Sequence, residues 1–512
     1  FGVDYDAEKD AAVITSTPVD PLALAVTPTS ESFTLDGKTV KYDAYTNVLY
    51  VSKPYDVKLQ SMNIFVPEGA DEDTPIILKS GSGAYMAAEA KTPTGEADDI
   101  ISQALAEGYV VISPAARGRN VTYKDAEGND VFYGTGPANA VDLKAAIRYL
   151  RYNDAAIPGD CDKIIVDGTS ASGAMGAILG TSGDSAAYEP YLEEIGAADT
   201  SDAVFAVMNF CPIVDLDNVE IAYEWMFGPY YDLEFYQDPA CEADIVLSDI
   251  MAGYYPAYLN SLGLKDPETG KALTLDEKDI YSGSYMDYLL GYINDAATEY
   301  LSDMTADEIA AYLDSEDAQG RKISTWLSYD AKTKEATVTD FAGYVTGWYK
   351  SALKMKTVPS FNDIPGRHAG EPFYESLYSE NSVFGTYEVQ NRNFSNYLSQ
   401  ALTDAQAKGY WKDLDPKDYV VSDEVKALAN MYNPMYWIAN EDEDISTFAE
   451  HFYVRVGNKD HDTSQTIAVN YATALMNAGH DVNFKMQWEQ PHAGDYEMDE
   501  MFTWISEITK AK

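Results

Sequence analysis

Short apolar runs alternate with segments of helical periodicity between residues 75 and 210, and this alternation limits the folds open to the chain. The apolar runs lie at 75–79, 109–113, 163–167 and 203–210. Residues 98–107 and 138–151 lie between them, and the apolar residues at 141, 143, 146, 147 and 150 form one helical stripe. Buried strands that alternate with helices of about 10–15 residues are typical of a parallel sheet with crossover helices. The sequence therefore predicts an α/β domain.

The alternation stops in the middle of the chain and resumes near its end. Upstream, Asp36 and Gly37 separate two runs of period two, which predicts a hairpin, and a further strand is expected at 61–66. Residues 216–430 are rich in tyrosine, helical in patches and without such buried runs. A strand at 451–456, a helix at 463–478 and a strand at 482–488 then complete the pattern. We predict one α/β domain made of residues 32–215 and 431–512, an inserted cap or lid at 216–430, and an extended lead-in at 1–31.

The charge of the chain excludes several classes of partner. Lys and Arg total 35 against 84 Asp and Glu, a formal net charge of -49, and such a surface repels nucleic acids and anionic membranes. No run of about 18 apolar residues is present, so no membrane insertion is expected. Cys161, Cys211 and Cys241 form no metal-binding or disulfide motif. A chain that is acidic, poor in cysteine and starts at Phe1 is expected to be a secreted or cell-surface bacterial protein, with a cytoplasmic one as the alternative; its oligomeric state is not predicted.

The segment IIVDGTSASGAMGAILG carries the strongest chemical signal. A buried strand leads into Gly168 and Ser170 and then into a helix of small residues, which is the context of a nucleophilic serine on a sharp strand-to-helix turn. The pattern G-x-S-x-G is missed by one position, because Ser172 stands where the second glycine is expected and Gly173 follows it. The alternative is a tight turn at which the helix packs close to the sheet.

A serine nucleophile needs a histidine base and an orienting acid, in this chain order Ser, Asp or Glu, His. Of the five histidines, His492 lies on the loop that follows the last predicted strand, where α/β sheets hold their ligands. The loop after the preceding strand holds both Asp460 and Asp462. Either aspartate fits the position of the acid.

An oxyanion intermediate requires backbone N–H groups that converge on it. We expect one from Ala171, directly after the serine, and one from the loop after the strand at 75–79, where Gly83 lies in the sequence GSGA. Glycines let the backbone approach a substrate carbonyl closely. The alternative is a simple glycine turn.

These residues lie in blocks that resemble the tannase and feruloyl esterase branch of the α/β-hydrolases, in particular the bacterial tannases. The blocks are KSGSGAYM, SPAARGR, GPANAVDLKAAIRYLR, GTSASGAMGAILG, NFCPIVDLDNVEIAYEW, RVGNKDHDTS and WEQPHAGDYEMDEMFTWI. The resemblance runs from about residue 63 onward and implies an α/β-hydrolase fold with a large lid. It also implies Ser170 as nucleophile, His492 as base and Asp460 as acid, with no metal and no organic cofactor.

The resemblance further implies how a phenolic substrate is held. The family binds the hydroxyls of a galloyl ring through a lysine, a glutamate and an aspartate, and the matching positions are Lys356 in KTVPSF, Glu380 in SENSVFG and Asp462. The chain departs from the family at Ser172, which replaces a glycine, and in a longer segment between Lys356 and Glu380.

The expected function is a serine esterase acting on small esters of phenolic acids, with galloyl esters as the first candidate. A feruloyl esterase, a general carboxylesterase or a peptidase on the same fold is the alternative, because a fold alone does not determine the substrate. A ligand-binding module without catalysis is a third reading. The chain order Ser170, Asp460, His492 argues against it.

Overall fold

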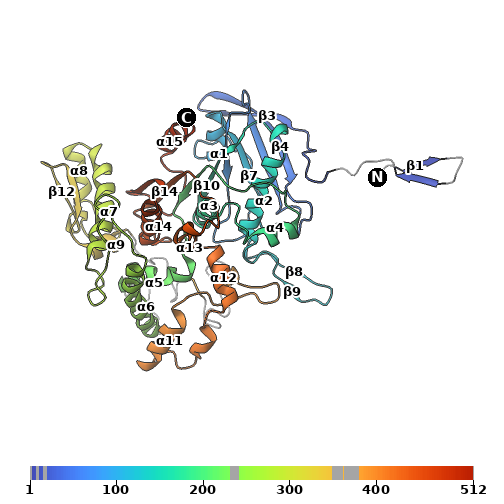
Figure 1. The fold of residues 1–512 in the computed structure, drawn as a ribbon. Helices are drawn as coiled ribbons and strands as arrows, with labels where there is room; N and C mark the ends of the chain where they lie inside the picture. Colours follow the sequence, from blue (N-terminus) through green and yellow to red (C-terminus); the bar gives the residue numbers. More distant parts are fainter. Residues whose placement is uncertain are drawn as a thin grey trace.

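A sheet of nine strands forms the centre of this computed structural model, which describes residues 3–6, 11–14, 20–230, 241–348, 361–362 and 380–510 (Figure 1). The strand order is β15-β14-β11-β10-β6-β7-β5-β4-β3. Strands β7, β6, β10, β11, β14 and β15 are mutually parallel, whereas β3, β4 and β5 pair antiparallel at one side. The bounds are β3 Thr29–Leu35, β4 Lys38–Leu49, β5 Ser61–Pro67, β6 Pro75–Lys79, β7 Val110–Pro114, β10 Asp160–Thr169, β11 Ala206–Phe210, β14 His451–Gly457 and β15 Asp481–Gln487.

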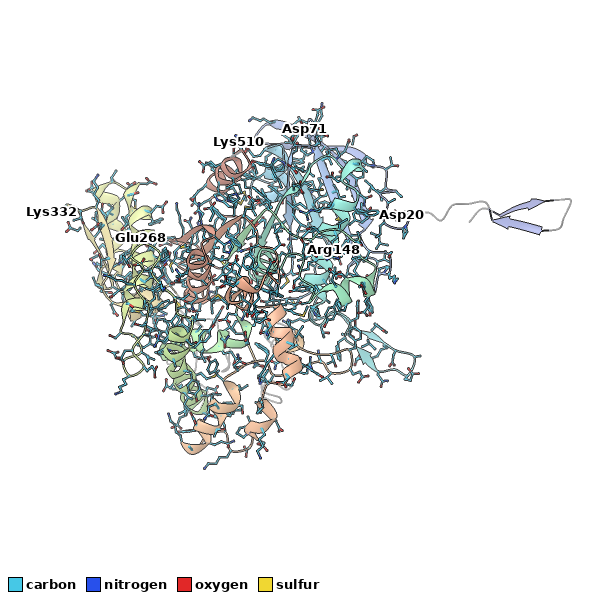
Figure 2. The ribbon with its side chains drawn as sticks, in the orientation of Figure 1. Asp20, Asp71, Arg148, Glu268, Lys332 and Lys510 are labelled. Carbon is cyan, nitrogen blue, oxygen red and sulfur yellow. The ribbon has the colours of Figure 1, made fainter. Side chains whose placement is uncertain are left out.

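The central strands are mostly apolar because helices cover both of their faces. Neighbouring residues of one strand point to opposite faces, so Ile76 and Leu78 belong to one buried cluster and Ile77 to the other. The first cluster includes side chains of α2 (Ala138–Tyr152), α3 (Ala171–Thr181), α4 (Glu189–Ile195) and α14 (Gln465–Ala478). The second includes α1 (Ile100–Ala106) and α15 (Met498–Lys510). Side chains fill the space between the sheet and these helices (Figure 2). The layers confirm the predicted α/β-hydrolase fold.

The predicted hairpin at Asp36 and Gly37 joins β3 to β4. Both residues have positive φ, 50° and 77°, as a two-residue turn between twisted strands requires. β3 begins at Thr29, because the long β4 offers partners as far as Ala44. A separate pair, β1 (Val3–Asp6) and β2 (Ala11–Ile14), lies within the segment expected to be an extended lead-in.

The chain between β11 and β14 adds helices and one small hairpin to the sheet. Figure 1 shows two lobes, one with α7, α8, α9 and β12 and one with α5, α6, α11 and α12. Their bounds are α5 Leu216–Phe227, α6 Cys241–Ser261, α7 Ser284–Ser302, α8 Ala306–Asp314, β12 Leu327–Asp330, β13 Glu335–Val338, α9 Phe341–Gly347, α11 Leu398–Ala407, α12 Asp423–Met431 and α13 Pro434–Ala439. The short strands β8 (Tyr123–Lys124) and β9 (Asp130–Val131) form a third small sheet. Short 3₁₀ helices lie at Asp154–Ala156, Gly228–Tyr230, Ile323–Thr325, Glu380–Ser382, Pro416–Tyr419 and Glu441–Glu443.

Two further predictions concern membranes and cysteines. Within the described ranges, each helix is too short or too polar to cross a bilayer. Cys161 and Cys211 are both buried free thiols.

Candidate active site

Ser170 lies at a strained turn between β10 and α3. Its φ of 62° and ψ of -123° place a residue with a side chain in a sparsely populated backbone region. The turn is tight on both sides, since a Cβ at Gly168 would lie 2.2 Å from the Ser172 carbonyl oxygen and one at Gly173 would lie 2.7 Å from that of Phe210. Glycine is therefore needed at both positions, and Ser170 is left half-buried at the end of the strand. This is the local geometry of a nucleophile elbow.

The loops after β14 and β15 bring Asp460 and His492 together. His492 Nδ1 lies 2.9 and 3.0 Å from the two carboxylate oxygens of Asp460. The Oδ1 atom of Asp460 also accepts 2.8 Å hydrogen bonds from the backbone N–H groups of Asp462 and Thr463. Because a carboxylate only accepts, the Nδ1 atom carries the hydrogen and Nε2 is left to act as a base.

The environment keeps Asp460 charged although it is buried. Burial acts to raise the pKa of its carboxyl, but the charge of the imidazole of His492 when it is protonated and the hydrogen bonds from His492, Cys211 and Thr463 outweigh burial and hold that pKa below its usual value. A charged carboxylate at this position orients the imidazole and stabilises its protonated form.

The His492 loop is pressed against the elbow. A Cβ on Gly494 would lie 1.7 Å from Thr169 Oγ1, and Thr169 directly precedes Ser170. The acid loop in turn touches the His492 loop, because a Cβ on Gly457 would lie 2.1 Å from the carbonyl oxygen of Gln490. The structure thus gathers Ser170, Asp460 and His492 at the carboxyl ends of β10, β14 and β15.

Cys211 is a neighbour of this group that the sequence did not single out. It follows β11 with a φ of 44°, and its Sγ lies 3.1 Å from the carbonyl oxygen of Ala493. Ligand atoms of Cys211, Asp460 and His492 lie within 4.8 Å of one another, the one such group with metal-binding potential among the described residues. Burial raises the pKa of the Cys211 thiol well above its usual value, so the thiol stays protonated and can donate a hydrogen bond to a neighbouring acceptor. Its position at the carboxyl end of a central strand was the available signal.

The two residues expected to form the oxyanion hole lie on adjoining segments. Ala171 is the first residue of α3, and Gly83 is exposed on the loop after β6. The backbone of that loop is strained, with φ of 47° at Ala84 and 58° at Tyr85. The Tyr85 hydroxyl donates a 2.5 Å hydrogen bond to the carbonyl of Ile213, whose own N–H lies 3.4 Å from the carbonyl oxygen of Ser170.

Two further hydrogen bonds tie the loop after β6 to helices α3 and α2. The Ser172 hydroxyl donates to the carbonyl of Ser82 at 2.6 Å, and the Asn139 side chain donates to the Ser82 hydroxyl at 2.8 Å. All three side chains are buried. Ser172, noted in the sequence only as a departure from a glycine, therefore contacts the loop that carries Gly83.

The expected phenol-binding residues lie on different segments. Glu380 is buried at the start of the 3₁₀ helix Glu380–Ser382. Burial and then the charge of Glu380 raise the pKa of Tyr85, which places this carboxylate close to the loop after β6. Asp462 is half-buried on the acid loop, with Oδ2 3.7 Å from His461 Nε2. Lys356 lies outside the described residues.

A buried ion cluster links the His492 loop to the sheet. Lys79 Nζ, at the end of β6, lies 2.9 Å from Asp167 Oδ2 on β10 and 2.6 Å from Asp495 Oδ2, three residues after His492. Burial and the nearby Asp495 carboxylate raise the pKa of Asp167 to about 8, against the opposing effect of Lys79. Such a pairing of residues from distant segments fixes the loop on the strand that carries the elbow.

Two solved structures of known proteins are similar to this structure over almost the whole chain. The structure of a tannase from Fusobacterium nucleatum is 32% identical, with a TM-score of 0.75, and the match covers 94% of this chain and 98% of that one. The tannin acyl hydrolase from Lactobacillus plantarum in its native form is 30% identical, with a TM-score of 0.75 and coverage of 94% and 97%.

Two further matches cover only part of the chain. The BD-FAE family model matches residues 62–226. The Mycobacterium tuberculosis esterase LipQ is 38% identical over 92 residues, which are 18% of this chain and 21% of that protein. The chain thus spans about a fifth of the length of LipQ. The two matches that extend over nearly the full length decide the assignment, and the chain belongs to the family of bacterial tannases.

Proposed function

We propose that the protein is a serine hydrolase of carboxylic esters of phenolic acids and that galloyl esters are its substrates. The observation that carries the proposal is the pair of hydrogen bonds from His492 Nδ1 to Asp460, on a loop that packs against the residue preceding Ser170. This arrangement leaves Nε2 of the imidazole as the base for the serine hydroxyl.

The reaction follows from these positions. His492 Nε2 takes the proton of Ser170 Oγ as this oxygen forms a bond to the ester carbonyl carbon, and the carbonyl oxygen becomes an oxyanion. The N–H groups of Gly83 and Ala171 donate to that oxyanion. His492 then gives its proton to the leaving alcohol as the ester C–O bond breaks, and an acyl-enzyme remains. Water, deprotonated by the same imidazole, releases the acid and restores Ser170.

The galloyl assignment rests on the relatives and on the acidic side chains near the elbow. The similar structures include tannin acyl hydrolase in complex with ethyl gallate and with 3,4-dihydroxybenzoate, both 29% identical to this chain. Phenolic hydroxyls donate hydrogen bonds to carboxylates, and Glu380 and Asp462 are the carboxylates proposed for this role, with Lys356 as the cationic partner.

A feruloyl esterase is the second candidate, and the BD-FAE match over residues 62–226 favours it. That match covers the sheet strands from β5 to β11 and the elbow, but it leaves out β3, β4, β14 and β15 and most of the segment between β11 and β14. Because Glu380 lies in this uncovered segment, the substrate distinction depends on residues outside the match.

A rate panel tests the proposal. Methyl gallate should exceed methyl benzoate by about 10⁴-fold in kcat/KM, because carboxylates placed for ring hydroxyls are left unpaired by a ring without them. A serine-directed organophosphonate should label Ser170, and Ser170→Ala and His492→Ala should each abolish turnover with a Tm within a few degrees of wild type. Preference for methyl ferulate would overturn the galloyl assignment alone, and turnover in Ser170→Ala would overturn the esterase mechanism.

A further inference from the structure

We propose that the protein has a second, non-catalytic binding site for the neutral phenolic ring of an ester substrate. The site is a cavity of about 380 Å³ between α2, α4, α12 and residues 385–387. Pockets for small ligands are typically about 300–1,000 Å³, so one aromatic ring with its ester group fits. The proposal rests on the proposed function only for the chemical identity of the ligand, a phenolic ester.

The cavity is separate from the candidate active site. Ser170, Asp460, His492, Gly83 and Glu380 do not line it. It lies at the amino-terminal end of α2, where Pro137, Ala138 and Val141 contribute apolar surface, and Ile195, Leu428 and Met431 extend that surface from α4 and α12.

Exposed tyrosines gather at this cavity. Among the described residues, five tyrosines are exposed, and Tyr55, Tyr191 and Tyr387 line the cavity at 39%, 38% and 42% exposure. The ring of a fourth, Tyr123, contacts Tyr133, which stacks on Tyr55. Solvent-exposed aromatic surface concentrated around one hollow marks a ligand site more often than scattered exposed rings do.

The tyrosines on one side are held in place before any ligand arrives. Tyr387 donates a 3.1 Å hydrogen bond to the Tyr55 hydroxyl, and Tyr55 donates to Glu194. The Arg117 guanidinium lies 4.9 Å from the centre of the Tyr55 ring and is itself fixed by a 2.8 Å bond to the buried Asp142. A wall fixed in this way loses little side-chain entropy on binding.

Tyr191 supplies an uncommitted ring from α4. It makes no ring contact with another aromatic residue in the described part of the chain, although it lines the cavity. Aromatic rings pair in offset-stacked or edge-to-face geometry, which a phenolic ring satisfies. We assign Tyr191 as the main stacking residue.

The charges of the site select a neutral ligand with hydroxyl donors. Both guanidinium groups that line the cavity have carboxylate partners, Arg117 with Asp142 and Arg392 with Glu424 at 3.2 Å. The Glu194 and Glu424 carboxylates line it as well, in a chain of net charge -49. Ring hydroxyls donate to such carboxylates, whereas the carboxylate of a free phenolic acid is repelled. The site therefore takes the ester and not the acid product.

Equilibrium dialysis of the Ser170→Ala protein with methyl gallate tests the site directly. We expect Tyr191→Ala and Tyr387→Ala, each added to Ser170→Ala, to lower the number of methyl gallate molecules bound per chain by one. The matched control is Tyr152→Ala, which removes an exposed tyrosine at the other end of α2, about 20 Å along the helix, and should leave that number unchanged. Both cavity tyrosines are well exposed, so the variants should fold, and their Tm values check this.

The outcomes separate this proposal from the proposed function. A decrease from two to one supports both sites, and a decrease from one to zero supports the second site while it contradicts galloyl binding at Ser170. Unchanged binding in both tyrosine variants overturns the second site. Binding of gallate, the anionic acid, as tightly as methyl gallate overturns the assigned ligand class.

Discussion

The Ser172 hydroxyl donates a 2.6 Å hydrogen bond to the carbonyl of Ser82, and this bond joins the elbow helix to the loop that holds Gly83. Both residues are buried, so water does not replace the donor when it is removed. The side chain that departs from the family pattern thus braces one wall of the proposed oxyanion hole.

Ser172→Ala should lower kcat on methyl gallate about tenfold. This loss is smaller than the roughly 10²–10³-fold loss that follows removal of an oxyanion donor, because the variant only loosens the loop that carries the donor. The change leaves a buried carbonyl unpaired and should cost about 1–3 kcal/mol of stability. KM should stay within twofold, because the bond acts on the transition state. Steady-state kinetics and urea unfolding measure the two effects.

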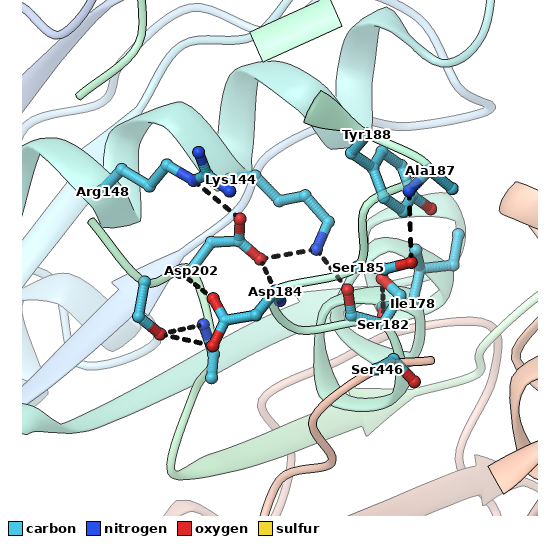
Figure 3. A network of polar contacts seen from close by, with 12 residues as sticks. Lys144, Arg148, Ile178, Ser182, Asp184, Ser185, Ala187, Tyr188, Asp202 and Ser446 are labelled. Atoms are coloured by element: carbon cyan, nitrogen blue, oxygen red, sulfur yellow. Dashed lines mark hydrogen bonds and ion pairs between the residues drawn. The ribbon is translucent and has the colours of Figure 1, made fainter. Parts of the chain in front are cut away.

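Ser182→Ala is the control for this variant. Ser182 caps the other end of α3, where its hydroxyl donates at 2.7 Å to the carbonyl of Ile178 (Figure 3). The helix of 11 residues separates it from the elbow by about 16 Å. This variant should keep kcat, and an equal loss in both variants would mean that Ser172 acts only through stability.

Asp460 and Asp462 should differ sharply when each is changed to asparagine. Asp460→Asn should cost on the order of 10⁴ in kcat, because the amide no longer holds the proton of His492 on Nδ1. Asp462→Asn should mainly raise KM for methyl gallate and spare p-nitrophenyl acetate. The reverse pattern would show that the roles of these two neighbours are exchanged.

Asp495→Asn should lower kcat by about 10²-fold, because Lys79 then holds the His492 loop less firmly and a displacement of about 1 Å costs that much. KM should change little. The control is Asp202→Asn, which weakens another buried cluster beyond the carboxyl end of α3 (Figure 3). In that cluster the Asp202 carboxylate lies 2.7 Å from Lys144 Nζ and 2.8 Å from Arg148 Nε. It should reduce Tm and keep kcat. A kcat for Asp495→Asn within twofold of wild type would exclude a positioning role.

Glu220→Gln should alter the pH dependence of stability. Burial raises the pKa of the Glu220 carboxyl from 4.5 to about 7, despite hydrogen bonds from Ser395, Asn362 and Phe361. Between these values the folded chain keeps a proton that the unfolded chain has released, so stability falls as the pH rises through this window, by up to about 3 kcal/mol.

The glutamine variant has no such proton to lose. It should match wild type near pH 4 and exceed it at pH 8, and urea unfolding at both pH values measures the difference. Equal stability of the two proteins at pH 8 would mean that Glu220 remains charged without penalty. Asp215, whose pKa burial also raises to about 7, is present in both proteins and does not enter the comparison.

The sequence predicted the sheet well because each central strand is buried on both faces. β6 has the predicted bounds, whereas β10 begins at Asp160, three residues early, because this residue pairs with Pro75 across an irregularity in the ladder. The hairpin of β12 and β13 was not predicted. Its strands have four residues each and bury only alternate side chains such as Ala336 and Val338, too short a run for period two to be recognised.

The site was predictable where it depended on position along strands and not where it depended on contacts between distant segments. The sequence placed Asp460 and Asp462 on one loop without distinguishing them, and the structure brings only the Asp460 carboxylate to His492. Lys79 and Asp495 are 416 residues apart, and neither carries a local signal of the other. Tertiary packing alone creates such a pair.

The insertion between β11 and β14 also sets the timing of folding in the newly made chain. β14 pairs in parallel with β11, yet about 240 residues separate the two strands in the sequence. At a synthesis rate of about 5–20 residues per second, the ribosome needs roughly 10–50 s to make this segment. Until β14 emerges, the apolar strand Ala206–Phe210 is an open edge of the sheet, the kind of edge that pairs with other chains. The length of the insertion therefore sets how long the nascent protein is exposed to aggregation.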